Sequence, residues 1–416
     1  MCTQDVKLDA ERKVLCMTEV SEALEKLLSK IPKCSEYVKI DIDKAYGLVT
    51  AEDIKAPMPV PHFPKSAMDG YAVKALEVAG ASYDKPVVLK VIGELCAGEY
   101  EEVNVGDNTA LRVMTGSLVP EGFDAVVRQE DTDYGMENVS VFKGVKQYQN
   151  YCKVGEDISP DDVVIKKNTK INSLHIGILA SLGIEKINVI RPMSVAIVST
   201  GTELTELGKP LGNAKIYNSI SHILSSKINA AGQKILSTDC CVDDVETLSA
   251  LIKERISYAD ILITTGAVSV GKKDIIPEVM EKIGAQRIFK GLNIQPGTPT
   301  EANVYDGKVI LCFSGNPYAA IANFELFYWE ILSKYMDNKS FKNPVKSAIL
   351  DTPYDKVNKL RRLVRGVYND GHVSINTTVH SSSVISNMAE CNCFIDFKEN
   401  TPVSVGDTVK VILLRE

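Results

Sequence analysis

Three features are missing from this 416-residue sequence, and each absence excludes a class of protein. No apolar run reaches the length of a membrane span, and the opening residues, MCTQDVKLDAERK, contain no apolar signal region. Positive charge is not in excess, because 47 Lys and Arg against 54 Asp and Glu leave a net charge of -7. We therefore expect no membrane association and no nucleic-acid-binding surface as the main function.

Cysteines with the spacing of a metal site are also missing. The ten cysteines are scattered, and the close pairs Cys240–Cys241 and Cys391–Cys393 have neither zinc-site spacing nor a matching second pair. We therefore expect reduced, mostly buried thiols in a cytoplasmic protein.

The length predicts two to four domains, and the sequence pattern suggests where they meet. A proline cluster at 57–64 can be neither helix nor central strand, so it indicates a domain crossing. Short strand-like runs between glycine turns follow, which are typical of a small β domain. We expect an N-terminal linker or dimer domain at 1–56 plus 155–190, an inserted β domain at 57–154, an α/β domain at 191–340 and a C-terminal β domain at 341–416.

The α/β section contains three apolar strands that each end in a hydroxyl–glycine turn and lead to a helix. These turns are STG at Ser199, TTG at Thr264 and SGNP at Ser314. In an open parallel sheet, ligands bind outside the carboxyl ends of the strands. Three such loops converging on one crevice predict an anion-binding site, although each turn alone is also consistent with an ordinary satisfied turn.

The stretch from Ala259 to Pro277 is the most informative of the three. Its apolar strand breaks at TTG, crosses Gly271 and reaches Asp274 before a helical pattern. Glycines let the backbone approach a ligand, and the N–H groups at a helix start carry partial positive charge. Asp274 is better suited to hold a metal ion than to touch a phosphate.

Eight motifs in order resemble the molybdopterin molybdenumtransferase (MoeA/gephyrin) family over nearly the whole chain. They are SAMDGYAV at Ser66, RVMTGSLVPEGFDAVVRQE at Arg112, GEDIS at Gly155, STGTEL at Ser199, GAVSVGKKD at Gly266, PGTP at Pro296, SGNP at Ser314 and CNCFI at Cys391. The resemblance implies a multidomain fold, α/β plus β. A central α/β molybdopterin-binding domain with a parallel-rich sheet, shared with molybdopterin adenylyltransferases, would join a β-rich inserted domain and a C-terminal β barrel-like domain.

The resemblance also implies a reaction and its partners. The family inserts molybdenum from molybdate into adenylated molybdopterin and releases AMP with the help of Mg²⁺. The subunits would form an elongated homodimer in which second-domain loops of one subunit approach the third domain of the other. Handover involving molybdopterin adenylyltransferase and molybdoenzymes is the expected partnership.

The residues of this chain that match the family's motifs divide into three sets. The catalytic set is Asp274, Asp157 and Glu203, and the metal set is Asp274, Asp243 and Asp244. The cofactor-binding set is Thr115, Ser199, Thr200, Gly201, Thr265, Gly266, Ser269, Gly271, Pro296, Gly297, Ser314, Gly315, Asn316 and Pro317.

The oxyanion pocket departs from the family pattern. The family has a basic residue before its Pro-Gly turn and a lysine after it, where this chain has Gln295 and Thr298. Ala319 stands where the family's serine contributes to the oxyanion site. Each lost charge-assisted hydrogen bond is worth on the order of 1.5–3 kcal/mol. Replacement cations in the sequence are Lys272, Lys273, Lys290 and an arginine near 361–365.

Three functional interpretations stay open at this point. The first is a working molybdenumtransferase with a rebuilt oxyanion site. The second is a diverged paralogue that binds pterin or nucleotide and performs another step. The third is a non-catalytic dimeric scaffold. The presence of Asp274 favours catalysis, because a scaffold does not need a carboxylate at the mouth of a helix.

Overall fold

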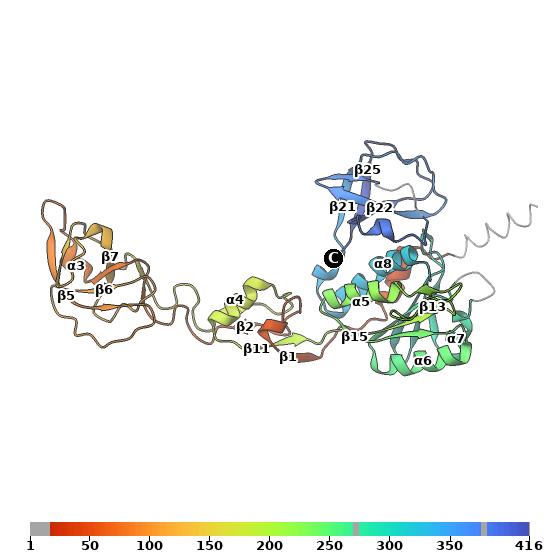
Figure 1. Cartoon of the computed structure of the whole chain (residues 1–416), viewed down its shortest axis with the longest axis horizontal. Coiled ribbons are helices and arrows are strands. Elements are labelled where there is room, and N and C mark those ends of the chain that lie inside the picture. The colour runs from red at the N-terminus through yellow and green to blue at the C-terminus, as the bar shows by residue number, and fades with distance from the viewer. Residues whose placement is uncertain (1–16, 269–273, 376–380, 416) are drawn as a thin grey trace, which may run out of the picture.

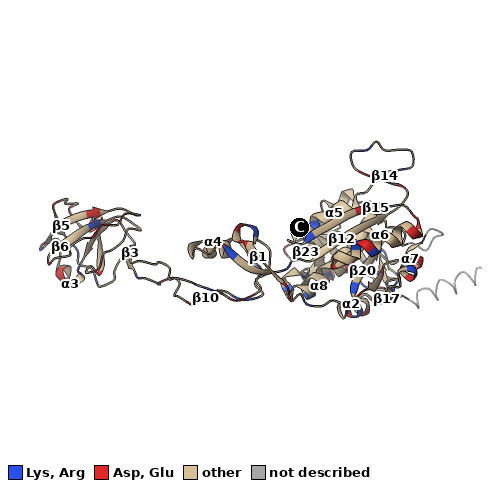
Figure 2. Cartoon of the chain, turned by 90° about the horizontal axis from the view of Figure 1, so that it is seen from below, with Lys and Arg blue, Asp and Glu red and all other residues tan. Residues whose placement is uncertain are grey.

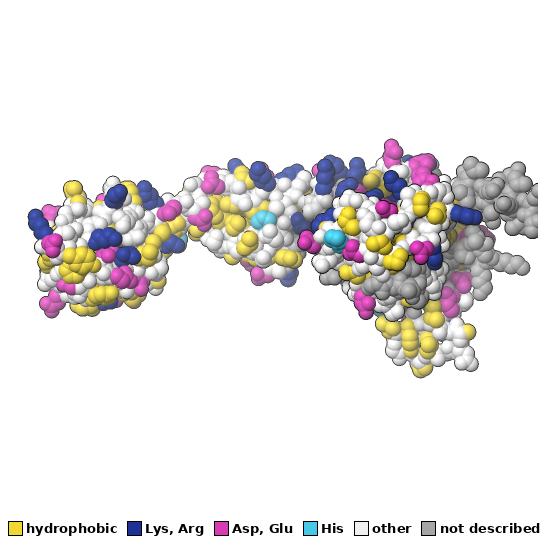
Figure 3. Space-filling view, turned by 90° about the horizontal axis from the view of Figure 1, so that it is seen from above, with side chains coloured by type: hydrophobic (Ala, Val, Ile, Leu, Met, Phe, Trp, Pro, Cys, Tyr) yellow, Lys and Arg dark blue, Asp and Glu magenta, His cyan; other side chains and the backbone are white. Residues whose placement is uncertain are grey.

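The computed structural model describes residues 17–268, 274–375 and 381–415 of the chain. The molecule is elongated, with the inserted β domain at one end, a small linker module in the middle and the α/β and C-terminal domains together at the other end (Figure 1). A narrow waist joins the inserted domain to the linker module (Figure 3). None of the helices formed by the described residues is long and apolar enough to cross a membrane.

The inserted domain is built on one mixed sheet with the strand order β7-β4-β6-β5-β8. Its two faces are covered by separate apolar clusters, one around Leu89 and Val127 and one around Leu111 and Val126. Neighbouring residues of a strand therefore point to opposite cores, as the two-residue period of β structure requires. The elements are β3 (Lys65–Ser66), β4 (Gly70–Val73), α3 (Ala75–Val78), β5 (Val87–Leu95), β6 (Thr109–Val113), β7 (Ala125–Arg128), η2 (Gln129–Asp131), β8 (Asn138–Val141) and β9 (Tyr151–Cys152).

The linker module brings together two segments that are separated in sequence by the inserted domain. Strand β1 pairs antiparallel with β11, and β2 pairs antiparallel with β10. Its elements are β1 (Tyr37–Asp41), η1 (Ile42–Lys44), β2 (Ile54–Lys55), β10 (Val163–Ile165), α4 (Ser173–Ser181) and β11 (Lys186–Ile190). The sequence motif at Asn172 caps α4, since the Asn172 side chain accepts from the His175 amide and the His175 ring from the Asn172 amide.

The α/β domain has a six-stranded sheet in the order β15-β12-β16-β20-β19-β17. The first four strands are parallel, whereas β19 and β17 form an antiparallel edge. Helices α2, α5 and α8 cover one face and α6 and α7 the other, so the central strands are buried throughout (Figure 1). Continuous apolar runs suit this double burial.

The elements of this domain are α2 (Val20–Leu28), β12 (Ser194–Thr200), β13 (Leu204–Thr205), β14 (Ile216–Tyr217), α5 (Ile220–Ala230), β15 (Lys234–Cys241), α6 (Val245–Tyr258), β16 (Ile261–Thr265), α7 (Ile276–Ile283), β17 (Gln286–Lys290), β18 (Ile294–Gln295), β19 (Glu301–Tyr305), β20 (Lys308–Phe313) and α8 (Pro317–Tyr335). Helix α2 packs on α8 and β17 although it is distant from both in sequence. The domain limits expected from the sequence stay a prediction.

The C-terminal domain is a closed barrel. Its strands follow the order β22-β23-β21-β25-β24, and the pairing of β24 with β22 closes the ring. Strand β18 adds in parallel to β22, so main-chain hydrogen bonds join the barrel to the α/β domain. The elements are η3 (Lys339–Phe341), β21 (Val345–Leu350), β22 (Arg361–Asn369), β23 (His372–Ser374), η4 (Ser386–Met388), β24 (Cys393–Phe397) and β25 (Thr408–Leu413). The predicted fold class is confirmed.

Candidate functional site

The three hydroxyl–glycine turns meet at the carboxyl ends of β12, β16 and β20, which are adjacent parallel strands. The Thr265 hydroxyl donates to the Ser199 Oγ at 3.0 Å, and the Gly266 amide donates to the Phe313 carbonyl at 3.0 Å. A Cβ on Gly266 would lie 2.1 Å from the Thr200 carbonyl oxygen. Glycine is therefore required where the loops touch, because the backbones approach closely; the predicted approach of a ligand at this glycine stays a prediction.

A small cavity of about 60 Å³ opens between these turns. Thr200, Thr265, Gly315 and Pro317 line it from the strand ends, and Glu203 faces it from the STG loop. The Thr200 Oγ1 is buried and has no hydrogen-bond partner among the described residues. An unpartnered buried hydroxyl at a strand end is suited to bind a ligand oxygen.

The remaining loop residues form the walls of this site. The Gly201 amide donates to the Cys241 carbonyl at 3.1 Å, which fixes the STG turn on β15. The Ser314 Oγ accepts from the Asn316 amide at 3.2 Å and starts the SGNP turn into α8, where Pro317 occupies the first helical turn. The predicted residues Ser269 and Gly271, and the cations Lys272 and Lys273, lie outside the described residues.

Asp274 lies just before α7 and near the TTG turn, since the Ile276 amide donates to the Ala267 carbonyl at 3.4 Å, and its side chain is mostly buried. Its Oδ1 atom is buried and has no hydrogen-bond partner among the described residues, while its Oδ2 lies 3.9 Å from the Lys290 ammonium. Burial raises the pKa of this carboxyl, and the nearby Lys290 only partly opposes that effect. A desolvated carboxylate with a vacant oxygen fits a single-carboxylate Mg²⁺ site completed by water and phosphate oxygens.

The other two acidic residues of the predicted metal set accept hydrogen bonds from neighbouring loop and helix residues. Asp244 caps α6 by accepting from the Thr247 amide at 2.8 Å and its hydroxyl at 2.6 Å, and these bonds lower its pKa. The Asp243 Oδ2 accepts from the Thr202 amide at 3.2 Å. Over the ranges that the structure describes, no three His, Cys, Asp or Glu side chains form a group able to hold a metal ion. Within the predicted metal set, Asp274 is thus the residue with a buried oxygen that has no partner among the described residues.

The Pro-Gly turn holds the departure from the family pattern. Gly297 has φ +101°, and a Cβ there would lie 2.4 Å from the Asn323 amide nitrogen of α8. Thr298 is engaged within the turn, because its Oγ1 donates to the Ile294 carbonyl at 2.5 Å. The Gln295 Oε1 accepts from Arg362 Nη1 at 2.9 Å, so a cation from the barrel occupies the place before the turn.

Arg365, a further arginine of the same strand, has a different role. Arg365 is fully buried, donates to the Val384 carbonyl at 2.7 Å and stacks on the Tyr318 ring at 4.1 Å. It therefore holds the serine-containing loop against the start of α8, where the Tyr318 amide donates to the Ser382 carbonyl at 3.0 Å. Of the arginines on β22, Arg362 is therefore the one that contacts the residue before the Pro-Gly turn.

Comparisons with known proteins show the family of the chain. Models of the MoeA N-terminal region (domain I and II), a probable molybdopterin binding domain and the MoeA C-terminal region (domain IV) match residues 18–183, 196–334 and 347–414. A molybdopterin molybdenumtransferase from Staphylococcus epidermidis is 32% identical over 398 residues, covering 95% of both chains. One from Bacillus subtilis is 34% identical over 374 residues, covering 88% of this chain and 87% of that protein. The chain belongs to the molybdopterin molybdenumtransferase (MoeA) family.

Solved structures of this family share the arrangement. A crystal structure of a molybdopterin biosynthesis MoeA protein from Pyrococcus horikoshii superposes with a TM-score of 0.82 at 27% identity, covering 96% of this chain and all of that one. A second structure from the same organism gives a TM-score of 0.79 at 26% identity over the same 96% of this chain. The family assignment supports a role in molybdenum cofactor biosynthesis.

The predicted residues of the inserted domain are not near the cleft of their own chain. Thr115 lies in the domain at the far end of the molecule, and Asp157 lies on the exposed connection to it (Figures 1 and 2). Thr115 donates from its amide and its hydroxyl to the Asp69 Oδ1, both at 2.7 Å, and these bonds lower the pKa of Asp69. Asp69 was not predicted as a site residue from the sequence, although it is the aspartate of the SAMDGYAV motif.

Sequence reasoning also missed a buried glutamate behind Asp274. Glu301 is fully buried on β19, and its Oε1 accepts from Arg287 Nε and Asn303 Nδ2, each at 3.1 Å. Its Oε2 lies 3.8 Å from the Lys290 ammonium that also faces Asp274. Glu301 was missed because β19, the strand between β20 and β17, was not expected from the sequence.

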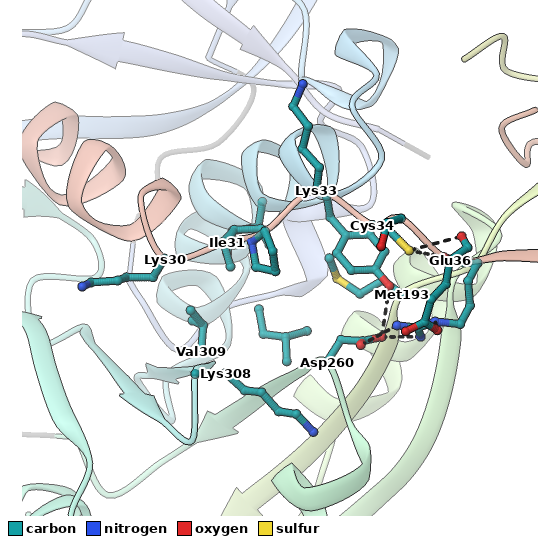
Figure 4. Close-up of a pocket in the computed structure, with 16 residues that line it drawn as sticks. Lys30, Ile31, Lys33, Cys34, Glu36, Met193, Asp260, Lys308 and Val309 are labelled. Atoms are coloured by element: carbon teal, nitrogen blue, oxygen red, sulfur yellow. Dashed lines mark hydrogen bonds and ion pairs between the residues drawn. The ribbon is translucent and has the colours of Figure 1, made fainter. Parts of the chain in front are cut away.

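A larger cavity of about 290 Å³ lies at the opposite, amino end of the sheet (Figure 4). Asp260 dominates its polar wall and accepts from both Arg191 terminal nitrogens at 2.8 Å and from the Ser194 amide at 2.7 Å. Arg191 also pairs with Glu36 at 2.6 Å, which ties the linker module to the α/β domain. These charges are engaged with one another, so this cavity has a structural character.

Proposed function

We propose that this chain is a molybdopterin molybdenumtransferase that inserts molybdenum from molybdate into adenylated molybdopterin and releases AMP. The observation that carries the proposal is the meeting of three hydroxyl–glycine turns beside a carboxylate with a vacant, buried oxygen. Strand-end turns of this kind bind phosphate groups through backbone N–H groups. The proposed location is the cytoplasm, where the small-molecule substrates would be available.

The residues divide the work between binding and orientation. Thr200, Thr265 and the glycine turns bind the anionic pterin phosphate, and Glu203 faces the polar groups of the ligand in the same cavity. Asp274 would hold Mg²⁺, which when bound polarises the phosphoanhydride that is cleaved. Asp243 and Asp244 shape the neighbouring loops through Thr202 and Thr247.

The oxyanion pocket uses a cation from the barrel. Arg362 Nη1 donates to the Gln295 Oε1 at 2.9 Å. This contact supports a rebuilt molybdate site and not a pocket that has lost its positive charge. The Ser381 and Ser383 hydroxyls, 2.9 Å apart, add polar groups from the loop that reaches the start of α8. The contact of Arg362 with Gln295 favours the transferase over a diverged paralogue.

The change Arg362→Gln tests the pocket, and Arg361→Gln is its matched control. Arg361 is adjacent but forms a bidentate pair with Asp396 on the other side of the strand. We expect Arg362→Gln to raise the KM for molybdate about tenfold or more, because one charge-assisted contact is worth roughly 1.5–3 kcal/mol. Arg361→Gln should lower thermal stability with little effect on that KM. Equal KM values in the two variants would contradict the rebuilt pocket.

We also propose a homodimer in which Thr115, Asp69 and Asp157 of one subunit complete the cleft of the other. The distance between the inserted domain and the cleft within one chain supports this arrangement (Figure 1). Mixing Asp274→Asn subunits with Asp69→Ala subunits should restore roughly a quarter of wild-type activity, because half of randomly paired dimers are mixed and have one intact site. No recovery after subunit exchange would argue for sites within single chains.

The deciding assay measures AMP release from adenylated molybdopterin with Mg²⁺, with and without molybdate, together with reconstitution of a molybdenum-free apoenzyme. Molybdate-dependent AMP release with reconstitution is the expected result. AMP release without reconstitution would identify the diverged paralogue instead. Absence of substrate binding would leave the non-catalytic scaffold as the remaining interpretation. In that case Asp274→Asn should not alter the binding of a partner protein. Handover to molybdoenzymes, and from an adenylyltransferase, is tested by the same reconstitution.

A further inference from the structure

The Lys290 ammonium lies between two carboxylates at the edge of the cleft. It is 3.9 Å from the Asp274 Oδ2 and 3.8 Å from the Glu301 Oε2. Neither distance is a direct hydrogen bond, so the ammonium is shared between them and tightly held by neither. The Lys290 side chain is partly exposed at the end of β17, which leaves it free to shift.

Glu301 cannot follow such a shift. It is fully buried on β19, and Arg287 and Asn303 each hold its other oxygen at 3.1 Å. Its Oε2 has no hydrogen-bond partner within the described part of the chain and faces Lys290 alone at ion-pair distance. A buried carboxylate with one vacant oxygen attracts the nearest cation strongly.

We propose that Lys290 is an internal competitor for the divalent cation at Asp274, and that Glu301 draws this ammonium partly away from the metal position. The inference rests on the proposed metal role of Asp274. Lys290 is then a residue that tunes metal affinity, and Glu301 is a positioning residue that acts through it.

Electrostatics gives the two residues opposite effects. A positive charge about 4 Å from a metal-binding carboxylate repels a divalent cation, and the repulsion is stronger in a partly buried site than in water. Removal of the Lys290 charge should therefore tighten metal binding. Removal of the Glu301 charge should weaken it, because Lys290 then associates with Asp274 alone. Damage to the fold would weaken metal binding in both variants.

The test is a titration of the full-length, substrate-free protein with Mn²⁺ at low ionic strength. Electron paramagnetic resonance monitors the free Mn²⁺ and so gives the dissociation constant. We expect Lys290→Gln to bind Mn²⁺ about five- to tenfold more tightly and Glu301→Gln about threefold more weakly than the wild type. Glu301 also acts directly on Asp274 through its charge, so Glu301→Gln should lose less affinity in the Lys290→Gln background than it loses in the wild type. Lys342→Gln, which removes an ammonium of similar exposure that pairs with Glu330, is the matched control and should change the affinity by less than about twofold.

The outcomes separate this inference from the proposed function. Asp274→Asn should remove the site; if it leaves Mn²⁺ binding unchanged, the metal role of Asp274 fails and the inference fails with it. If Asp274→Asn removes binding but Lys290→Gln does not tighten it, the inference alone is overturned. An additive effect of Glu301→Gln in the double variant would also overturn it. If neither the wild type nor Lys290→Gln binds Mn²⁺ measurably, the inference is overturned.

Discussion

Two aspartates mark the two ends of β16 and differ in almost every respect. Asp260, at the amino end, accepts two hydrogen bonds from Arg191 and one from the Ser194 amide. Asp274, beyond the carboxyl end, has one buried oxygen without a partner and a distant ammonium at the other. The same side chain is thus structural where its bonds are made within the protein and available for chemistry where they are left open.

Their pKa values change in opposite directions for the same reason. Burial alone would raise both, but the hydrogen bonds from Arg191 and Ser194 outweigh burial and lower the pKa of Asp260. At Asp274 burial outweighs the Lys290 contribution, and the pKa rises. An acidic residue whose charged form is destabilised by folding, so that its pKa is raised, indicates a ligand site.

The largest expected effect is on activity at the carboxyl end. Asp274→Asn should lower the rate of AMP release by roughly 100-fold or more, because the metal-binding charge is lost. It should not reduce stability, since the Oδ1 makes no bond to lose. Single-turnover assays and urea unfolding measure the two quantities. Retained activity would mean that the open oxygen has no role.

Asp260→Asn should show the reverse pattern. Replacement of the carboxylate breaks the bidentate pair with Arg191 and leaves that guanidinium half-buried. We expect a loss of about 2–3 kcal/mol in the free energy of unfolding, as for charged hydrogen bonds in general. The rate per folded subunit should stay within about threefold of the wild type. A selective loss of activity would show that the amino end takes part in catalysis.

The pH dependence of stability should separate the two residues again. Asp260 has a lowered pKa, so it stabilises the fold above its ordinary value of 3.8, and this contribution is lost as pH falls through the lowered value. Asp274 has a raised pKa, so its ionisation destabilises the metal-free fold as pH rises from 3.8 through the raised value. Urea unfolding with a chelator, from about pH 2 to pH 7, should show a smaller rise in stability for Asp260→Asn and a larger one for Asp274→Asn. Parallel curves for both variants and the wild type would contradict these shifts.

The smallest expected effect is at the bond between the turns. Thr265→Val removes the hydroxyl that donates to Ser199 and should reduce stability by about 1 kcal/mol. A larger loss of substrate affinity than of stability would place the hydroxyl on the ligand. Ser237→Ala, whose buried hydroxyl has no partner among the described residues, is a control for removal of a hydroxyl from the same sheet.

Local patterns in the sequence were enough to predict the parallel part of the sheet and its turns. Apolar runs that end at Ser199, Thr264 and Ser314 correspond to β12, β16 and β20, and the loops converge as their parallel order requires. The β character of the C-terminal section was also predicted, and the described residues there form five barrel strands.

The antiparallel edge was not predictable in the same way. Strands β17 and β19 contain charged residues, including the buried Glu301, because ion pairs with Arg287 and Lys290 compensate its burial. Such compensation depends on neighbours that only the fold brings together. The contact of Arg362 with Gln295 is equally non-local, since 67 residues separate them.

The pairing of β18 with β22 has a consequence for how this pocket could change over time. Main-chain hydrogen bonds set the register, so the side chains at 295 and 362 stay neighbours whatever their identities. A positive charge lost from one strand can therefore be supplied by the other without any movement of the backbone. A positive side chain at either position 295 or position 362 can therefore supply the same charge. The residues at these positions can change during evolution while the pocket keeps its positive charge.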